Sequence, residues 1–238
     1  MKTNLHQNDK TCMHQFFQEV SEWSALEAKD VRRLEKVVAC CQLEVGDVLF
    51  EEGDPCLGVH FVKSGLIGLR KSALDGYSTL LRIVRPGDSL GIRSLIAEES
   101  HRATAKVLKR SLVCFIDAAN IRSVIQQNLT LGNNLLKHTA VELGEADERY
   151  HEMATRNLRS RLAHLLMLLN DGDARIGKSG SLKFELPVSR TDMAAMLGVR
   201  RESVSRTIHE FEQEGLAHFT DRNVEIPDQK SLQAEFRP

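Results

Sequence analysis

Four polar side chains near the carboxyl terminus have the types and spacing needed to read the edges of base pairs. This recognition set consists of Arg201, Glu202, Ser205 and Arg206. At positions i, i+1, i+4 and i+5, all four side chains project from one side of a helix. Arginine can donate two hydrogen bonds to guanine, glutamate can accept from the amino group of cytosine, and serine can bond to a base or a phosphate. The alternative is a solvated charged face in which Glu202 pairs with Arg206.

The residues before the recognition set predict the helices that would position it. Ser189 with Asp192 three residues later is typical of a capping box, and Gly198 ends the short helix that follows. A second helix is expected over residues 200–214, and its buried side is expected to hold Val204, Ile208 and Phe211. This pattern predicts a helix-turn-helix and favours DNA binding over the solvated face. Further candidate DNA contacts are Ser189, Arg190 and Arg200.

The surrounding elements extend this motif to a winged helix over residues 157–238. Asn157 is a candidate cap for a helix with a leucine stripe. A strand is expected over 182–186, and a β-hairpin over 216–219 and 224–226. Between Arg156 and Arg206, ten basic residues stand against five acidic ones, a local excess that suits a nucleic-acid partner.

Composition sets broad limits. The 238 residues, 42% hydrophobic and 27% charged, suit one or two globular domains, and the net charge is only -1. No apolar run has the length of a membrane span and residues 1–10 lack a signal-peptide core, so we expect a cytoplasmic protein without a membrane partner. Five cysteines, an odd number, argue against a disulfide framework.

The amino-terminal half changes character along the chain. We expect residues 1–15 to be flexible and residues 16–38 to form a helical segment. From residue 42 to 115, short apolar runs separated by glycine predict strands over 48–51, 58–63, 66–71, 78–84, 103–108 and 112–116. These strands predict a β-barrel or jelly roll, which together with its flanking helices occupies residues 16–125.

A long helix is expected over residues 126–156. Apolar or small side chains recur along it in alternating steps of three and four, as in a coiled coil. These seam residues are Leu136, Thr139, Leu143, Ala146, Tyr150 and Met153. Burial against the β domain of the same chain is one alternative. We favour a homodimer, because two symmetric reading helices would meet two half-sites one DNA turn apart.

Together these features resemble the CRP/FNR superfamily of bacterial transcription regulators. The motifs that carry the resemblance are Gly46-Asp47, Gly53-Asp54, Val62-Lys63-Ser64-Gly65, Pro86-Gly87-Asp88, Leu197-Gly198-Val199 and the run from Arg201 to Arg206. The resemblance implies an α+β fold with a cyclic-nucleotide-binding-like jelly roll, a dimerisation helix and a carboxy-terminal winged helix. It also implies RNA polymerase as a partner and an inverted-repeat DNA site. The serine at position 205 resembles the FNR branch, whose half-sites are similar to TTGAT. The arginine at position 201 resembles the cyclic-AMP branch, whose half-sites are similar to TGTGA.

The resemblance also identifies the positions where a cyclic nucleotide would bind. In cyclic-AMP-binding members, a Gly-Glu pair and an Arg-Ser pair hold the ribose and phosphate; here those positions carry Gly91-Ile92 and Arg102-Ala103. The isoleucine side chain cannot accept a hydrogen bond from the ribose hydroxyl, and the alanine side chain cannot donate one to the phosphate. Cyclic AMP is therefore disfavoured as the ligand. Arg102 could bind another anion or pair with Glu98 or Glu99. The effector-pocket candidates are Gly91, Ile92, Arg93, Arg102, Ala103, Ala146 and Asp147.

The sequence also bears on three other sensing groups: an iron-sulfur cluster, haem and a redox-active thiol. An iron-sulfur cluster is disfavoured because only Cys12 lies in the amino-terminal region, where the FNR-like pattern has three cysteines besides one at Cys114. Cys40 and Cys41 suit buried apolar positions better than ligand positions. Haem stays an alternative, with histidines in or near the sensor half at His14, His60, His101, His138 and His151. Cys12 is a candidate redox thiol, and control by abundance alone is the remaining possibility.

Catalysis finds no support in the sequence. It contains no nucleophile elbow, no Walker phosphate loop and no His-Glu-x-x-His motif. We therefore expect a regulator rather than an enzyme. A ligand-binding protein that uses its winged helix to dock a protein is the alternative from another class.

Overall fold

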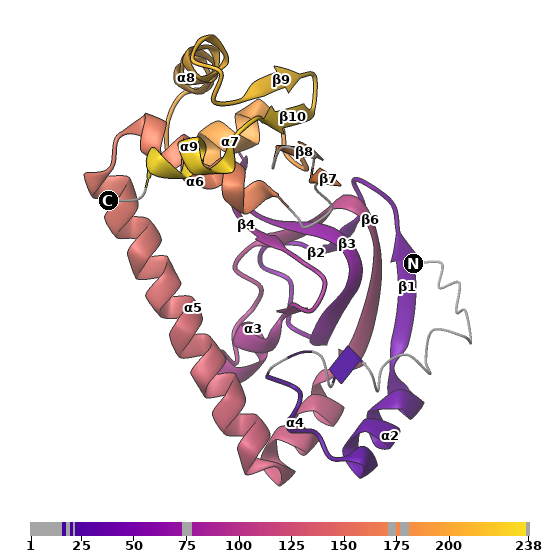
Figure 1. Cartoon of the computed structure of the whole chain (residues 1–238). Helices are drawn as coiled ribbons and strands as arrows, with labels where there is room; N and C mark the ends of the chain where they lie inside the picture. The colour runs from indigo at the N-terminus through magenta and orange to yellow at the C-terminus, as the bar shows by residue number, and fades with distance from the viewer. Residues whose placement is uncertain are drawn as a thin grey trace. The chain divides into compact units, whose positions relative to one another are not determined.

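The structure, a computed structural model, describes residues 16–17, 20, 22–72, 78–170, 175–176 and 181–236. The chain forms two compact units, Met1–Glu145 and Ala146–Pro238 (Figure 1). Residues 1–15, which we expected to be flexible, lie outside the described part. None of the described helices is both long and apolar enough to cross a bilayer.

One antiparallel sheet dominates the first unit. Its strands are β1 (Ala39–Leu43), β2 (Val48–Phe50), β3 (Gly58–Ser72), β4 (Ser78–Val84), β5 (Ser89–Leu90) and β6 (Thr104–Asp117). The order is β1-β6-β3-β4, with β2 on β6 and β5 on β3. We predicted two separate strands within β3 and two within β6. Both predictions were wrong, because register shifts between residues 62 and 67 carry the long strands through the interruption.

Side chains from five strands meet inside the sheet. This buried cluster consists of Phe50, Val62, Ile67, Val84, Leu90, Ala105 and Val113. Since β2 and β4 lie on different sides of the β6-β3 pair, the sheet must curl to bring these side chains together. The structure thus confirms the predicted jelly-roll architecture, and α3 (Ile92–Ala97) follows β5.

A second cluster joins the outer side of the sheet to the helices α2 (Ala28–Val37), α4 (Ala118–Gln127) and the start of α5 (Leu129–Thr155). Trp23 is fully buried there, with its ring 4.9 Å from that of Phe61. The helical segment that we expected over residues 16–38 is not continuous. Residues 22–25 form a turn and α2 begins only at Ala28.

A disulfide joins Cys40 of β1 to Cys114 of β6. The two residues face each other in the strand register, and both side chains are buried in the second cluster. We expected no disulfide and treated Cys40 as a free buried thiol. That expectation was wrong, because the sequence did not reveal β1 and therefore not its register against β6.

The second unit contains the predicted winged helix. Its helices are α6 (Leu158–Leu169), α7 (Arg190–Met196), α8 (Arg201–Gln213) and α9 (Gln229–Ala234), and its strands are β7 (Arg175–Ile176), β8 (Leu182–Glu185), β9 (His218–Thr220) and β10 (Asn223–Ile226). The strands pair antiparallel in the order β7-β8-β10-β9. Asn157 caps α6 by accepting a hydrogen bond from the backbone of Ser160, as predicted.

Candidate nucleic-acid interface

The first helix of the motif, α7, begins with the predicted capping box. The Ser189 hydroxyl accepts from the Asp192 amide at 3.1 Å, and the Asp192 carboxylate accepts from the Ser189 amide at 3.1 Å. The Ser189 hydroxyl also donates to that carboxylate at 2.8 Å. These bonds fix the start of the helix. They also use the Ser189 groups that would otherwise face a phosphate, whereas Arg190 is half-buried at the first helical position.

The second helix, α8, has the two faces that the sequence predicted. Val204, Ile208 and Phe211 are buried, and Arg200 forms the N-cap rather than the first turn. Gly198 occupies the turn between α7 and α8 with φ of +64°, a conformation that a residue with a side chain adopts only with strain. The buried face and the turn together fix the orientation of α8 against α7.

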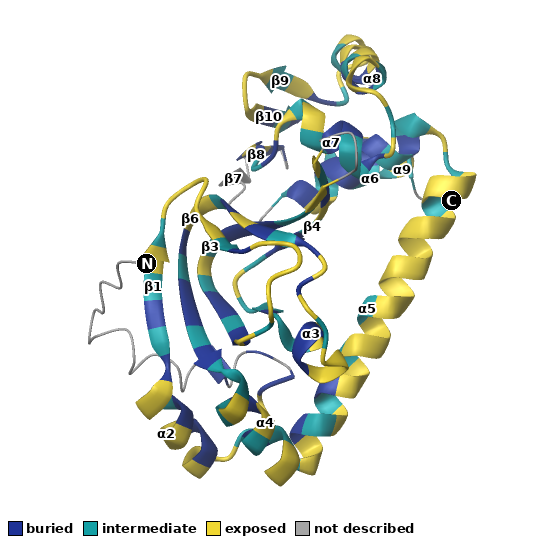
Figure 2. Cartoon of the chain, turned by 180° about the vertical axis from the view of Figure 1, so that it is seen from behind, coloured by how far each residue is buried: buried dark blue, intermediate teal, exposed yellow. Residues whose placement is uncertain are grey.

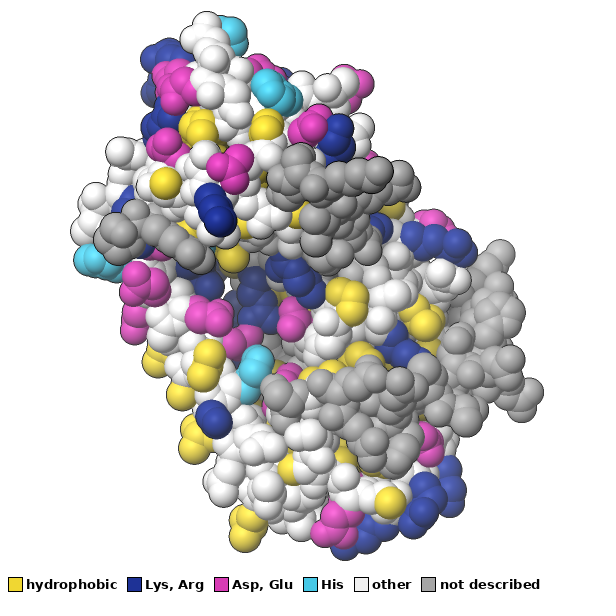
Figure 3. Space-filling view, in the orientation of Figure 1, with side chains coloured by type: hydrophobic (Ala, Val, Ile, Leu, Met, Phe, Trp, Pro, Cys, Tyr) yellow, Lys and Arg dark blue, Asp and Glu magenta, His cyan; other side chains and the backbone are white. Residues whose placement is uncertain are grey.

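The recognition set lies on the opposite face of α8. Arg201, Glu202 and Arg206 are exposed, and Ser205 is half-buried. Within the described chain, none of these four side chains forms a hydrogen bond or an ion pair, so the Glu202–Arg206 pair of the alternative is not formed. Lys and Arg side chains gather with acidic ones over α8 in the space-filling view (Figure 3). The free donors and acceptors of this face are available to a partner.

Three other arginines of this unit have structural roles that the sequence did not reveal. Arg159 donates to both Glu214 and Glu235 and stacks over the Phe211 ring at 5.0 Å. Those two carboxylates raise the pKa of its guanidinium. Arg161 donates to the Leu197 carbonyl at 2.8 Å, where α7 ends. Arg156 donates to the Phe236 carbonyl and pairs with Glu152. All three guanidinium groups therefore form contacts within the unit.

The seam residues of α5 are exposed in the single chain. Leu136, Leu143 and Tyr150 expose 69%, 63% and 77% of their surface. Thr139 and Ala146 are exposed as well, and Met153 exposes 48%. On α5 only Leu131 and Leu135 are buried, near its amino-terminal end (Figure 2). Within the first unit, Leu136, Thr139 and Leu143 are therefore not buried against the β domain, contrary to that alternative.

The positions matched to a nucleotide site have other partners. Arg102 donates to Glu99 at 2.6 Å, and Arg93 lies 3.7 Å from the same carboxylate. Gly91 has φ of +94°, and a Cβ there would lie 2.6 Å from the Gly58 carbonyl, so its role is backbone packing. Ile92 is half-buried and Ala103 is buried; Ala146 and Asp147 are exposed on α5. Arg102 thus adopts the pairing with a neighbouring glutamate that the sequence offered as one alternative.

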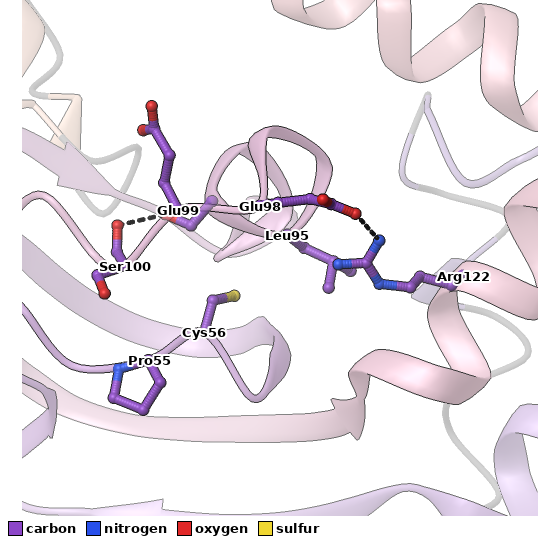
Figure 4. A pocket seen from close by; sticks show the side chains of 8 residues that line it. Pro55, Cys56, Leu95, Glu98, Glu99, Ser100 and Arg122 are labelled. Atoms are coloured by element: carbon purple, nitrogen blue, oxygen red, sulfur yellow. Dashed lines mark hydrogen bonds and ion pairs between the residues drawn. The ribbon is translucent and has the colours of Figure 1, made fainter.

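A cavity of about 260 Å³ lies between α3, α4 and the segment before β3 (Figure 4). Arg122 and Glu98 form an ion pair at its edge, with 3.1 Å between Nη1 and Oε1. The Cys56 thiol lies 3.4 Å from the carbonyls of Gly58 and Gly91. Burial raises the pKa of Cys56, which keeps the thiol protonated and weakly nucleophilic. Across the described residues, no three His, Cys, Asp or Glu side chains are grouped to hold a metal ion.

Comparison with known families defines the class of the protein. Residues 160–235 match the Crp-like helix-turn-helix domain, and residues 40–128 match the cyclic nucleotide-binding domain. These two domains, in this order around a long helix, define the CRP/FNR family of DNA-binding transcription regulators. The chain has this domain make-up.

Individual relatives agree with this class. The chain is 28% identical over 206 residues to the transcriptional regulatory protein btr of Bordetella pertussis, which covers 86% of this chain and 84% of the relative. It is 27% identical to the cyclic AMP receptor protein of Thermus thermophilus, over 79% of this chain and 83% of that one. The structure of FixK2 from Bradyrhizobium japonicum has the same fold, with a TM-score of 0.72, 22% identity, and coverage of 85% and 98%. The relatives are transcription regulators rather than enzymes.

Proposed function

We propose that the chain regulates transcription as a homodimer that binds an inverted-repeat DNA site through the recognition set. The observation that carries the proposal is the exposed, unpaired state of Arg201, Glu202 and Arg206 on a helix whose other side is buried. Such side chains can bond to base edges without first breaking intramolecular ion pairs. In the described part of the chain, the Glu202–Arg206 pair that the solvated-face alternative included is not formed.

Each member of the recognition set has a proposed role. Arg206 donates two hydrogen bonds to a guanine, and Glu202 accepts from the amino group of a cytosine. Arg201 and Ser205 extend the contact to neighbouring bases, which gives half-sites with a GA core, similar to TTGAT in preference to TGTGA. Arg200 and Arg190 lie at the two helix starts, where their charges would contact backbone phosphates. Ser189 was also a candidate, but its hydroxyl and amide are engaged in the capping box, so we do not assign it a phosphate.

The homodimer is proposed from the seam residues. A stripe of exposed Leu, Tyr and Met side chains in heptad steps is stabilised by burial against a second helix. Figure 3 shows hydrophobic side chains along the exposed length of α5. A second copy of the same helix supplies a matching stripe, and the resulting two-fold symmetry suits an inverted repeat.

Control by an effector other than cyclic AMP, or by abundance alone, completes the proposal. Ile92 and Ala103 offer no hydrogen bond to a ribose or phosphate, and the Arg102 guanidinium is paired with Glu99. RNA polymerase is the proposed protein partner, as the family resemblance implies.

Fluorescence anisotropy on three labelled duplexes tests the proposal. The duplexes carry a TTGAT inverted repeat, a single half-site, and a scrambled sequence. We expect the inverted repeat to bind at least a hundredfold more tightly than the scrambled duplex at 150 mM salt, with the half-site in between. Binding to all three should weaken as salt rises, because phosphate contacts release counterions. Equal affinity for the three duplexes at every salt concentration would overturn the proposal.

A further inference from the structure

A second cavity, of about 350 Å³, opens inside the curled sheet of the first unit. Its walls come from β1, β2, β3, β6 and the segments before β3 and β6. Gly91, Ile92, Arg102 and Ala103, the positions matched to a nucleotide site, do not line it. Leu57, which is 69% exposed, stands at its rim. The volume is in the range of small-molecule sites and exceeds what one aromatic ring requires.

Aromatic rings form one wall of this cavity. Phe50 stacks on His101 with 3.6 Å between ring centroids and an interplanar angle of 11°. The His60 ring lies 5.6 Å from Phe50 and 4.8 Å from Phe115. Aliphatic side chains such as Leu43 complete the lining. Such a wall favours a planar aromatic molecule, which gains stacking as well as apolar burial.

His60 gives the cavity a neutral polar group beside that of His101. Within the described chain, its Nδ1 atom is buried without a hydrogen-bond partner, which is costly for an imidazole. Burial, aided by the neighbouring His101, lowers the pKa of His60 to about 4, so the ring is neutral near pH 7. A neutral imidazole can donate one hydrogen bond and accept another.

The lining also disfavours anionic ligands. Asp54 is the one charged residue among the lining residues, and its Oδ2 already accepts from the Glu51 amide at 2.8 Å. Neither Lys nor Arg contributes to the lining. A carboxylate or phosphate in this cavity would lose its hydration without gaining a cation.

We propose that this cavity binds a neutral aromatic molecule of one or two rings that hydrogen-bonds to His60. The ligand stacks on the ring wall, and a hydroxyl or ring N–H of the ligand donates to the accessible part of the His60 imidazole. The site is separate from the recognition set and from the nucleotide-site positions, so it adds a ligand function that the DNA-binding proposal does not require.

Ligand-detected NMR on the full-length protein tests this with three probes of one shape: naphthalene, 2-naphthol and 2-naphthoate. We expect 2-naphthol to bind most tightly and 2-naphthoate at least tenfold more weakly. His60→Phe keeps a ring in the wall but removes the hydrogen bond. The affinity for 2-naphthol should therefore fall at least fivefold, while the affinity for naphthalene should change less than twofold. Equal binding of naphthol and naphthoate, or no binding of any probe up to its solubility limit, would overturn the proposal.

Two substitutions on β1 give a matched test of location. Ala39 lines the cavity, whereas Gln42 is exposed and does not. Ala39→Phe should abolish 2-naphthol binding and Gln42→Phe should leave it within twofold, with circular dichroism and thermal unfolding reporting whether each variant is folded. Undiminished binding to folded Ala39→Phe would place the ligand elsewhere and refute the proposal. If Ala39→Phe does not fold, the His60→Phe comparison decides.

Discussion

Arginines of the carboxy-terminal unit fall into two groups according to what their guanidinium groups contact. Arg156, Arg159 and Arg161 bind carboxylates or backbone carbonyls of the same unit. Arg201 and Arg206 contact no carboxylate in the described chain and lie exposed on α8. The local excess of basic residues therefore overstates the charge that faces DNA. What a single arginine contributes depends on its neighbours in the fold rather than on its neighbours in the sequence.

Substitution of Arg206 tests the reading of one base pair. Arg206→Ala should lose about 1–3 kcal/mol of discrimination at a single guanine of the half-site, because one bidentate contact is removed. Competition binding against all single-base variants of the half-site measures this. The matched control is Arg200→Ala, which we expect to weaken all variants alike. An Arg206→Ala profile parallel to that of the wild type would show that Arg206 reads no base.

The half-buried His60 ring predicts a dependence of stability on pH. Its pKa is about 4 in the folded chain against a usual value of 6.5. As the pH falls below 6.5, the unfolded chain binds a proton that the folded chain does not, so stability is lost between pH 6.5 and 4. The loss reaches about 3 kcal/mol. Urea unfolding from pH 7 to 4.5 should show a steeper decline for the wild type than for His60→Phe; equal slopes would contradict the neutral, half-buried state.

At the scale of elements, α5 carries two kinds of surface along one helix. Leu131 and Leu135 near its amino-terminal end are buried among the helices and the sheet of the first unit, and Arg82 of β4 pairs with Glu142. Its seam residues remain exposed. Val141, 52% exposed, stands on the side of the helix away from the seam, where no partner is expected.

This difference predicts a large effect on dimerisation for one substitution on α5 and almost none for a similar one. Leu143→Glu places two like charges in the proposed dimer seam and should raise the dimer dissociation constant at least tenfold, or about 1.4 kcal/mol. Val141→Glu should change it less than twofold. Sedimentation equilibrium measures both constants. If the two variants associate equally, the seam does not lie where the heptad pattern predicts it.

Local patterns in the sequence were sufficient to predict the helix starts and the buried side of α8, but not the contacts between residues far apart in the chain. The capping box at Ser189, the cap at Asn157 and the buried side of α8 depend on residues within one or two turns. The short strand β1 depends instead on its register against β6, and its pattern, Ala-Cys-Cys-Gln-Leu, has no clear period. The Cys40–Cys114 disulfide joins residues 74 positions apart, and the Arg159 contacts join residues at least 55 positions apart. No pattern in a short stretch of sequence predicts such pairs.

At the scale of the whole molecule, we expect a symmetric homodimer that presents two copies of α8 to DNA. Two recognition helices related by a two-fold axis meet half-sites about 34 Å apart, which is one turn of DNA. Neither the two-fold symmetry nor this spacing requires an effector. An effector would act by changing how often the two helices are correctly placed.

Selection of binding sites from a random DNA library, with the purified full-length protein, tests the central claim most directly. The account predicts that the selected sequences contain an inverted repeat whose half-sites share a GA core and lie about one helical turn apart. It also predicts that selection with Arg206→Ala relaxes one position of that core on both arms. Selected sequences without an inverted repeat, or without a GA core in the half-sites, would contradict the claim that α8 reads DNA from a symmetric dimer.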